Sequence, residues 1–117
     1  MVTSLELTDV SARGATCCSS LVKEPLGQAD AERLAATLKA LADPTRLRLL
    51  SIVASSVDQE ACVCDLTEPV GLSQPTVSHH LKVLTEAGFL SRSKRGTWAY
   101  YRLQPDALSD VAGVLAI

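Results

Sequence analysis

The sequence predicts a mainly α-helical chain with one small β-hairpin, and three observations support this fold class. Apolar residues recur at helical spacing in several segments, Asp-Pro and Gly stand where helices would begin and end, and period-2 alternation is confined to one stretch. Of the 117 residues, 47% are apolar and 21% are charged, which is typical of a compact globular protein. We therefore expect one domain that folds around a single core.

Residues 1–28 are expected to form a flexible N-terminal arm. They mix Ser, Thr, Gly and Pro with scattered apolar residues and show no sustained period. The arm carries the adjacent pair Cys17 and Cys18. Residues 29–117 remain for the folded domain.

Two helices joined by a short corner are expected to open this domain. Leucines and alanines recur at helical spacing from Asp30 to Ala42. Asp43 can cap a second helix whose first position is Pro44, where the missing N–H of proline costs little. This second helix is expected to end at about Ser55.

A short helix followed by a longer one comes next, with the proportions of a helix-turn-helix. The short helix is predicted from Cys64 or Asp65 to Val70 and the longer one from Ser73 to Glu86, with Gly71 and Leu72 between them. In a helix-turn-helix the N-terminal part of the second helix enters the DNA major groove, where polar side chains can bond base edges. The polar side chains near the start of this helix are Gln74, Thr76, Ser78 and His79.

A β-hairpin with a basic tip is predicted directly after the second helix. Two short strands, over residues 89–94 and 97–103, flank a tight turn at Arg95 and Gly96. A hairpin in this position is the wing of a winged helix-turn-helix. It would place three basic residues near the DNA backbone or minor groove: Arg92, Lys94 and Arg95.

The charge distribution agrees with a DNA-binding face, although the net charge of −2 does not. Between Ser73 and Arg102 there are five basic residues and one acidic residue, whereas the rest of the chain has six basic and twelve acidic residues. Only the contacting face of a DNA-binding protein must neutralise phosphates. From charge alone, a solvated strand pair with basic side chains is an equally good interpretation.

A last helix is predicted to begin at Pro105, and it is apolar out of proportion to its length. Since the chain has few large core residues, this helix and the first one are expected to bury apolar surface against a second copy. The pattern therefore predicts a twofold homodimer.

The sequence argues against a membrane protein and against a secreted one. The longest stretch without charged residues has thirteen members, Pro69 to Leu81, and contains two prolines and a glycine. The N-terminal residues lack the basic start and following apolar run that are typical of a secretory signal. We therefore expect a cytoplasmic location, no membrane partner, and reduced cysteines that bind metals or react.

Four segments resemble the ArsR/SmtB family of winged-helix metalloregulatory repressors. They are LKALADPTRLRLL (Leu38 to Leu50), ACVCDL (Ala61 to Leu66), GLSQPTVSHHLKVLTEAGFL (Gly71 to Leu90) and KRGTWAYYRL (Lys94 to Leu103). The resemblance implies a homodimer joined through its first and last helices, bound to an operator with an imperfect inverted repeat. It also implies repression of transcription until an inducing metal ion or metalloid lowers the affinity for DNA.

The resemblance also implies roles for individual residues. By position, Gln74, Thr76, Ser78 and His79 would read DNA, and Lys82, Lys94 and Arg95 would contact phosphates. The zinc site that some members carry on the last helix needs His ligands there. This chain offers Asp106 and Asp110 but no His after His80, so that site is expected to be absent. His80 lies nearer the core side and is expected to be packed rather than a ligand.

The cysteines indicate the inducer. Soft thiolates favour As(III) or Sb(III) with three sulfurs, or Cd(II), Pb(II) or Zn(II) with up to four. Arsenic sensors of the family often have a third cysteine where this chain has Thr67, so the local pair Cys62 and Cys64 is one ligand short. We expect the arm to supply the rest, which gives a site of Cys17, Cys18 and one or both of Cys62 and Cys64. If both lay in a helix, Cys62 and Cys64 would diverge by about 200°, so joint binding would distort that turn.

Three alternatives remain open from the sequence. A sensor of Cd(II), Pb(II) or Zn(II) would use all four cysteines as ligands. A repressor that senses thiol redox state would use the same DNA-binding face with a disulfide as its trigger. An enzyme, such as a small thiol reductase, is disfavoured because the chain has no CxxC motif and no acid or base motif beside its cysteines.

Overall fold

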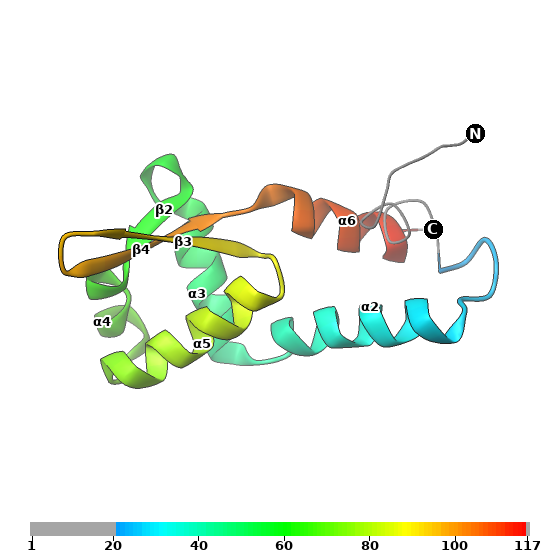
Figure 1. Ribbon diagram of the computed structural model, residues 1–117, viewed down its shortest axis with the longest axis horizontal. Helices are drawn as coiled ribbons and strands as arrows, with labels where there is room; N and C mark the ends of the chain where they lie inside the picture. Colours follow the sequence, from blue (N-terminus) through cyan, green and yellow to red (C-terminus); the bar gives the residue numbers. More distant parts are fainter. Residues whose placement is uncertain (1–20, 117) are drawn as a thin grey trace. The chain divides into compact units, whose positions relative to one another are not determined.

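A computed structural model describes residues 21–116 of the chain (Figure 1). Cys17 and Cys18, with most of the predicted arm, lie outside the described residues. No helix among the described residues is both long enough and apolar enough to cross a membrane. The elements follow in the order α2 (Gln28–Leu41), α3 (Pro44–Ser55), η1 (Val57–Gln59), β2 (Glu60–Cys62), η2 (Val63–Asp65), α4 (Thr67–Val70), α5 (Gln74–Glu86), β3 (Leu90–Arg95), β4 (Trp98–Leu103) and α6 (Pro105–Leu115).

The chain divides into two compact units, one of which brings together the two ends of the described segment. This first unit reaches to Ala36 and resumes at Asp106, so it contains most of α2 and of α6. The backbone N–H of Leu21 donates to the carbonyl of Val114, 2.9 Å away. These two helices are the ones that the sequence predicts to form the homodimer face.

The second unit, Thr37–Pro105, is a winged helix-turn-helix. Its three antiparallel strands lie in the order β2-β4-β3, so β4 is central and the hairpin of β3 and β4 extends beyond the short β2 (Figure 1). The mainly helical fold and the β-hairpin of the sequence prediction are confirmed. The centre of its core consists of fully buried side chains from α3, the turn before α4, α5 and the residue that precedes β3: Leu49, Val53, Leu66, Val77, Leu81, Leu84 and Phe89.

Local sequence signals account for most element boundaries. The Asp43 carboxylate accepts from the backbone N–H of Arg46 at 3.0 Å, and Pro44 occupies the first turn of α3, as predicted. Gly88, with φ of +91°, follows α5 in the left-handed region that favours glycine. Ser73 precedes α5, but its hydroxyl bonds the Thr76 hydroxyl at 3.0 Å rather than a backbone N–H.

Three local predictions need correction. Strand β2 is not predicted from the sequence, because it has only three residues and owes its extended form to pairing with β4. The predicted short helix is a 3₁₀ turn, η2, followed by a four-residue α4. The hairpin turn lies one residue later than predicted, because Arg95 still pairs with Trp98 and leaves Gly96 and Thr97 to reverse the chain.

Candidate functional site

The helix-turn-helix is formed by α4, a tight turn and α5. Gly71 ends α4 with φ of +69°, and its N–H donates to the carbonyls of Thr67 and Glu68 at 2.9 and 3.2 Å. Only glycine adopts this left-handed conformation at little cost, so the turn at Gly71 determines where α5 begins. One carbonyl of this corner, that of Pro69, accepts from Arg48 of α3 at 2.9 Å.

The two faces of α5 differ as the sequence predicts. Val77, Leu81 and Leu84 are fully buried. The opposite side is polar, with Ser78 half-buried and the remaining predicted DNA-reading residues exposed: Gln74, Thr76 and His79. Lys82, one turn further along, is also exposed.

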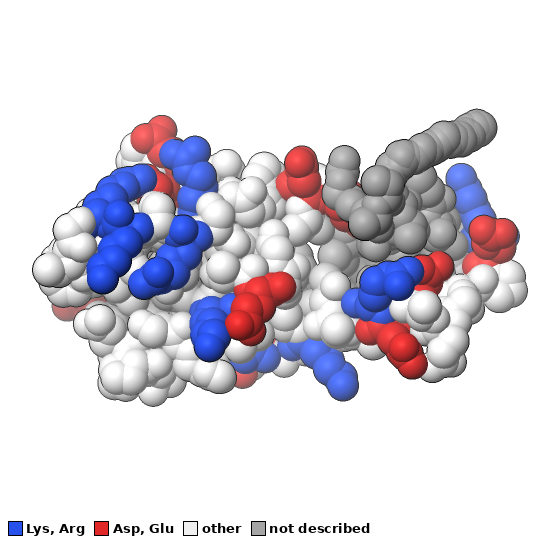
Figure 2. Space-filling model, viewed as in Figure 1, with Lys and Arg blue, Asp and Glu red and all other residues white. Residues whose placement is uncertain are grey.

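A groove of about 600 Å³ separates α5 from the hairpin. Its lining residues from α5 are Gln74, Ser78, Lys82, Thr85 and Glu86, and those from the hairpin are Arg92, Lys94, Thr97, Trp98, Ala99 and Tyr101. Basic side chains gather over the hairpin that forms one of its walls (Figure 2). The groove thus unites predicted base-reading and phosphate-binding residues, while Thr76 and His79 lie outside it.

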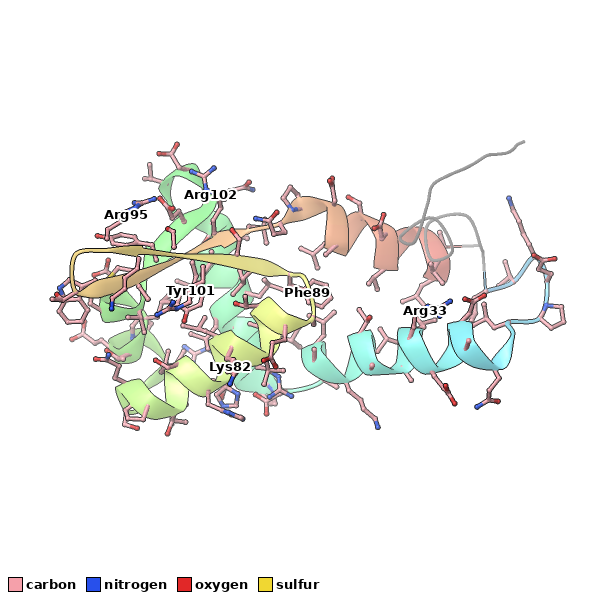
Figure 3. The ribbon with its side chains drawn as sticks, in the orientation of Figure 1. Arg33, Lys82, Phe89, Arg95, Tyr101 and Arg102 are labelled. Carbon is pink, nitrogen blue, oxygen red and sulfur yellow. A yellow bond between two sulfur atoms is a disulfide. The ribbon has the colours of Figure 1, made fainter. Side chains whose placement is uncertain are left out.

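Strand register separates the basic residues of the wing into two faces. Successive side chains of a strand point to opposite faces of the sheet. Arg92 and Lys94 lie opposite Tyr101 and Ala99 on the face that lines the groove. Arg95 belongs to the other face, and in Figure 3 it lies with Arg102 on the side of the sheet away from Tyr101.

Arg95 is already engaged in interactions within the protein. Its guanidinium donates to the Glu60 carboxylate at 2.6 Å and lies 4.4 Å from the centre of the Tyr100 ring. Arg102 lies 3.8 Å from the same carboxylate. Glu60 could not be singled out from the sequence, because its role depends on the β2–β4 pairing, which a three-residue strand does not reveal.

A second cluster connects the start of α3 to α5. Arg46 donates to the carbonyls of Ala40 and Lys39 at 2.7 and 3.3 Å, and its Nη1 lies 3.2 Å from Nδ1 of His80. The Arg46 backbone N–H holds the pKa of Asp43 below its ordinary 3.8; partial burial opposes this shift, and nearby His80 and the Arg46 guanidinium reinforce it. His80 has a side chain only 16% exposed, which confirms that it is packed.

Cys62 and Cys64 are joined by a disulfide, whereas the sequence analysis expected reduced thiols. The two residues do not both lie in a helix, the condition for a divergence of about 200°, because Cys62 has extended backbone and only Cys64 lies in a helical turn. Their Cα atoms are 5.1 Å apart, within the usual range for a disulfide. Cys62 is buried and Cys64 is exposed, so solvent reaches the pair from one side.

The described residues contain no group of three or more His, Cys, Asp or Glu side chains able to hold a metal ion. Cys62 and Cys64 supply two sulfurs, and the third and fourth of the predicted site, Cys17 and Cys18, lie outside the described part of the chain. A complete three-sulfur site therefore requires a further cysteine, from the first 20 residues or from a second copy.

Known proteins share both this sequence and this fold. A model of the bacterial regulatory protein, arsR family, matches residues 43–92. The arsenical resistance operon repressor of Bacillus subtilis is 38% identical over 78 residues, which cover 67% of this chain and 70% of that protein. The chain belongs to the ArsR family. The arsenic resistance transcriptional regulator ArsR1 of Pseudomonas putida is 48% identical over 68 residues, 58% of this chain, and the match spans about half (52%) of that protein.

Solved structures place this ArsR-family chain among winged helix-turn-helix regulators. The crystal structure of the AntR antimony-specific transcriptional repressor has a TM-score of 0.64 and 31% identity, and the match covers 77% of this chain and 80% of that one. A homodimeric winged helix-turn-helix DNA-binding domain from Mycobacterium bovis has a TM-score of 0.62 and 26% identity, covering 91% and 84%. The chain is thus a helix-turn-helix transcription regulator and not an enzyme.

Proposed function

We propose that this ArsR-family protein is a homodimeric repressor of an arsenical resistance operon that releases its operator when As(III) or Sb(III) binds its cysteine thiolates. The single observation that carries the DNA-binding part is the groove between α5 and the wing, because it combines base-reading and cationic side chains. The inducer part is supported by the cysteine set and by relatives that are arsenical resistance repressors.

Gln74 and Ser78 are proposed to read bases from the wall of the groove, and Thr76 and His79 from the exposed side of α5. A Gln amide can bond adenine with two hydrogen bonds, and hydroxyls bond either purine or pyrimidine edges. Lys82 and Lys94 are proposed to bind phosphates, together with Arg92, which lines the groove beside Lys94. Arg95 is left out of this set because Glu60 holds it on the opposite face.

A homodimer is proposed because one copy presents a single recognition helix. A twofold dimer matches the two halves of an inverted repeat, with its half-sites one helical turn apart. The M. bovis domain of the same fold is homodimeric. In this chain, Leu115 of α6 and Leu21 beside it are 42% and 45% exposed, and both belong to the unit that contains α2.

The inducer site is proposed to consist of Cys17, Cys18 and one or both of Cys62 and Cys64, in their reduced form. As(III) and Sb(III) are thiophilic, and three thiolates would satisfy their coordination. Cys64 is exposed and lies in the 3₁₀ turn that leads into α4, only a few residues before the helix-turn-helix corner at Gly71. A ligand held here acts on the same short segment that positions α5.

A second candidate function is redox sensing, and the Cys62–Cys64 disulfide is the observation that favours it. In that case oxidation of the two thiols, rather than metalloid binding, would release the operator. Sensing of Cd(II), Pb(II) or Zn(II) by all four cysteines is the remaining alternative, and the described residues favour it no more than the metalloid site.

Single cysteine variants test the sensor assignment. Cys62→Ser and Cys64→Ser, studied as full-length reduced protein, are expected to include at least one variant that binds the operator normally but is no longer released by arsenite. Thr67→Ser is a matched control, since it changes a neighbouring side chain that carries no sulfur. Normal release of both cysteine variants by every thiophile would exclude this pair as the sensor.

A further inference from the structure

The outer face of the sheet connects the cysteine pair to the tip of the wing through side chains that the proposed function does not use. Glu60 and Cys62 stand two residues apart in β2, so their side chains share one face. Their partners in β4 are Arg102 and Tyr100, respectively. Tyr100 also pairs with Ser93 of β3.

Tyr100 stands directly opposite Cys62 in the β2–β4 ladder. Directly opposed residues of an antiparallel pair have neighbouring side chains on one face. The guanidinium of Arg95 lies over the Tyr100 ring, 4.4 Å from the ring centre. The cysteine pair, the aromatic ring and the wing-tip arginine therefore follow one another in space.

Glu60 completes this set of contacts. Its carboxylate accepts from Arg95 at 2.6 Å and lies 3.8 Å from Arg102. The side chain of Glu60 is only 15% exposed, so solvent screens these charges less than those of a surface ion pair. Arg95 ends β3 and follows Glu60 by 35 positions in sequence, so the contact fastens the wing tip to the strand that bears Cys62.

We propose that Glu60 is a positioning residue that transmits the state of the Cys62–Cys64 pair to the wing through Arg95. A change in the bonding of Cys62 shifts β2, and the Glu60 carboxylate carries that shift to Arg95 and hence to the strand that presents Arg92 and Lys94 to the groove. The inference rests on the proposed function in taking this pair as the sensor. It adds a second route to DNA release besides the one through α4.

Trp98 provides a direct reporter of the wing tip. It is the only tryptophan of the chain, it pairs with Arg95 in the hairpin, and it is 44% exposed. The experiment uses full-length protein in which Cys17 and Cys18 are replaced by serine, so that only one disulfide forms. Dithiothreitol supplies two electrons and two protons to the disulfide, giving two thiols while it closes to its own cyclic disulfide. Trp98 emission is then compared between the two states.

The emission maximum is expected to differ between the dithiol and disulfide states, and Glu60→Gln is expected to abolish the difference. Glu68→Gln makes the same charge change in α4 and is expected to keep it. Arg95→Gln breaks the contact from the exposed side and is expected to act as Glu60→Gln does, which covers the case of a poorly folded Glu60 variant. Titration of free thiols verifies the state of the pair in every variant.

Two results would overturn the inference. The first is equal Trp98 emission in the dithiol and disulfide states of the protein that keeps Glu60 and Arg95. The second is an emission difference between these states that persists in both Glu60→Gln and Arg95→Gln. Since this experiment uses neither DNA nor metalloid, it is independent of the proposed function. Protein with all four cysteines that arsenite fails to release from its operator would contradict the proposed function and leave the link between Glu60 and the wing intact.

Discussion

Nη1 of Arg46 lies 3.2 Å from Nδ1 of His80, which joins the first residues of α3 to the middle of α5. The same guanidinium binds the last carbonyls of α2, those of Lys39 and Ala40. His80 neighbours His79 in α5, with ring centres 5.8 Å apart. Arg46 therefore holds the packed side of the helix whose exposed side is proposed to read DNA.

Arg46→Met is expected to lower the free energy of unfolding by about 2 kcal/mol, because charge-assisted hydrogen bonds to part-buried partners are lost. It is also expected to weaken operator binding, since α5 loses a positioning contact. Urea denaturation and fluorescence anisotropy measure the two effects. Arg48→Met is the control, since Arg48 is exposed and makes one bond, to the Pro69 carbonyl; an equal loss in both variants would contradict the role of Arg46.

Asp43→Ala is expected to reduce stability in a pH-dependent way. The pKa of Asp43 is lowered in the folded protein, so its contribution is complete above 3.8 and disappears as the pH falls through the lower, folded-state value. The stability difference from the parent protein is therefore expected to be largest at neutral pH and to shrink below pH 3.8. Asp43→Asn keeps the capping oxygen but not the charge, so it should show a smaller difference that does not shrink in the same way.

Lys94→Gln is expected to weaken DNA binding on all sequences and to reduce its salt dependence. Each lost phosphate contact lowers the slope of log affinity against log salt by about 1, hence by about 2 for a homodimer. Arg95→Gln is expected to leave the slope nearly unchanged, since Glu60 holds Arg95 on the other face of the sheet. Equal decreases of the slope in the two variants would show that Arg95 leaves Glu60 when DNA binds.

Thr67→Cys is expected to build a three-sulfur site within this part of the chain. Thr67 begins α4, and it occupies the position at which the family resemblance described above implies a third cysteine in many arsenic sensors. In a background with serine at positions 17 and 18, the substitution is expected to restore release of the operator by arsenite. The same background with Thr67 unchanged is the control, and release from that control would show that the arm cysteines are dispensable.

The helix-turn-helix was predictable from sequence because its signals are local. Asp43 and Pro44 mark the start of α3, Gly71 marks the turn, and the spacing of Val77 and Leu81 separates the buried from the exposed face of α5. Each depends on neighbouring residues alone.

The relationships missed from sequence depend on contacts between distant segments. Glu60 and Arg95 are 35 residues apart, and Arg46 and His80 are 34 apart, so no periodicity links them. The face on which Arg95 lies follows from strand register, which the one-residue error in the turn obscured.

Operator release tests the central claim most directly. Reduced full-length protein is bound to a labelled fragment of its own promoter and titrated with As(III), Sb(III), Cd(II), Pb(II) and Zn(II), with fluorescence anisotropy as the measurement. Release is expected from As(III) and Sb(III) at the lowest concentrations. The affinity for the operator is expected to fall by roughly 5- to 150-fold, the range common for allosteric coupling, or by more. Release chiefly by Cd(II) or Pb(II), or by none of these ions, would contradict this assignment.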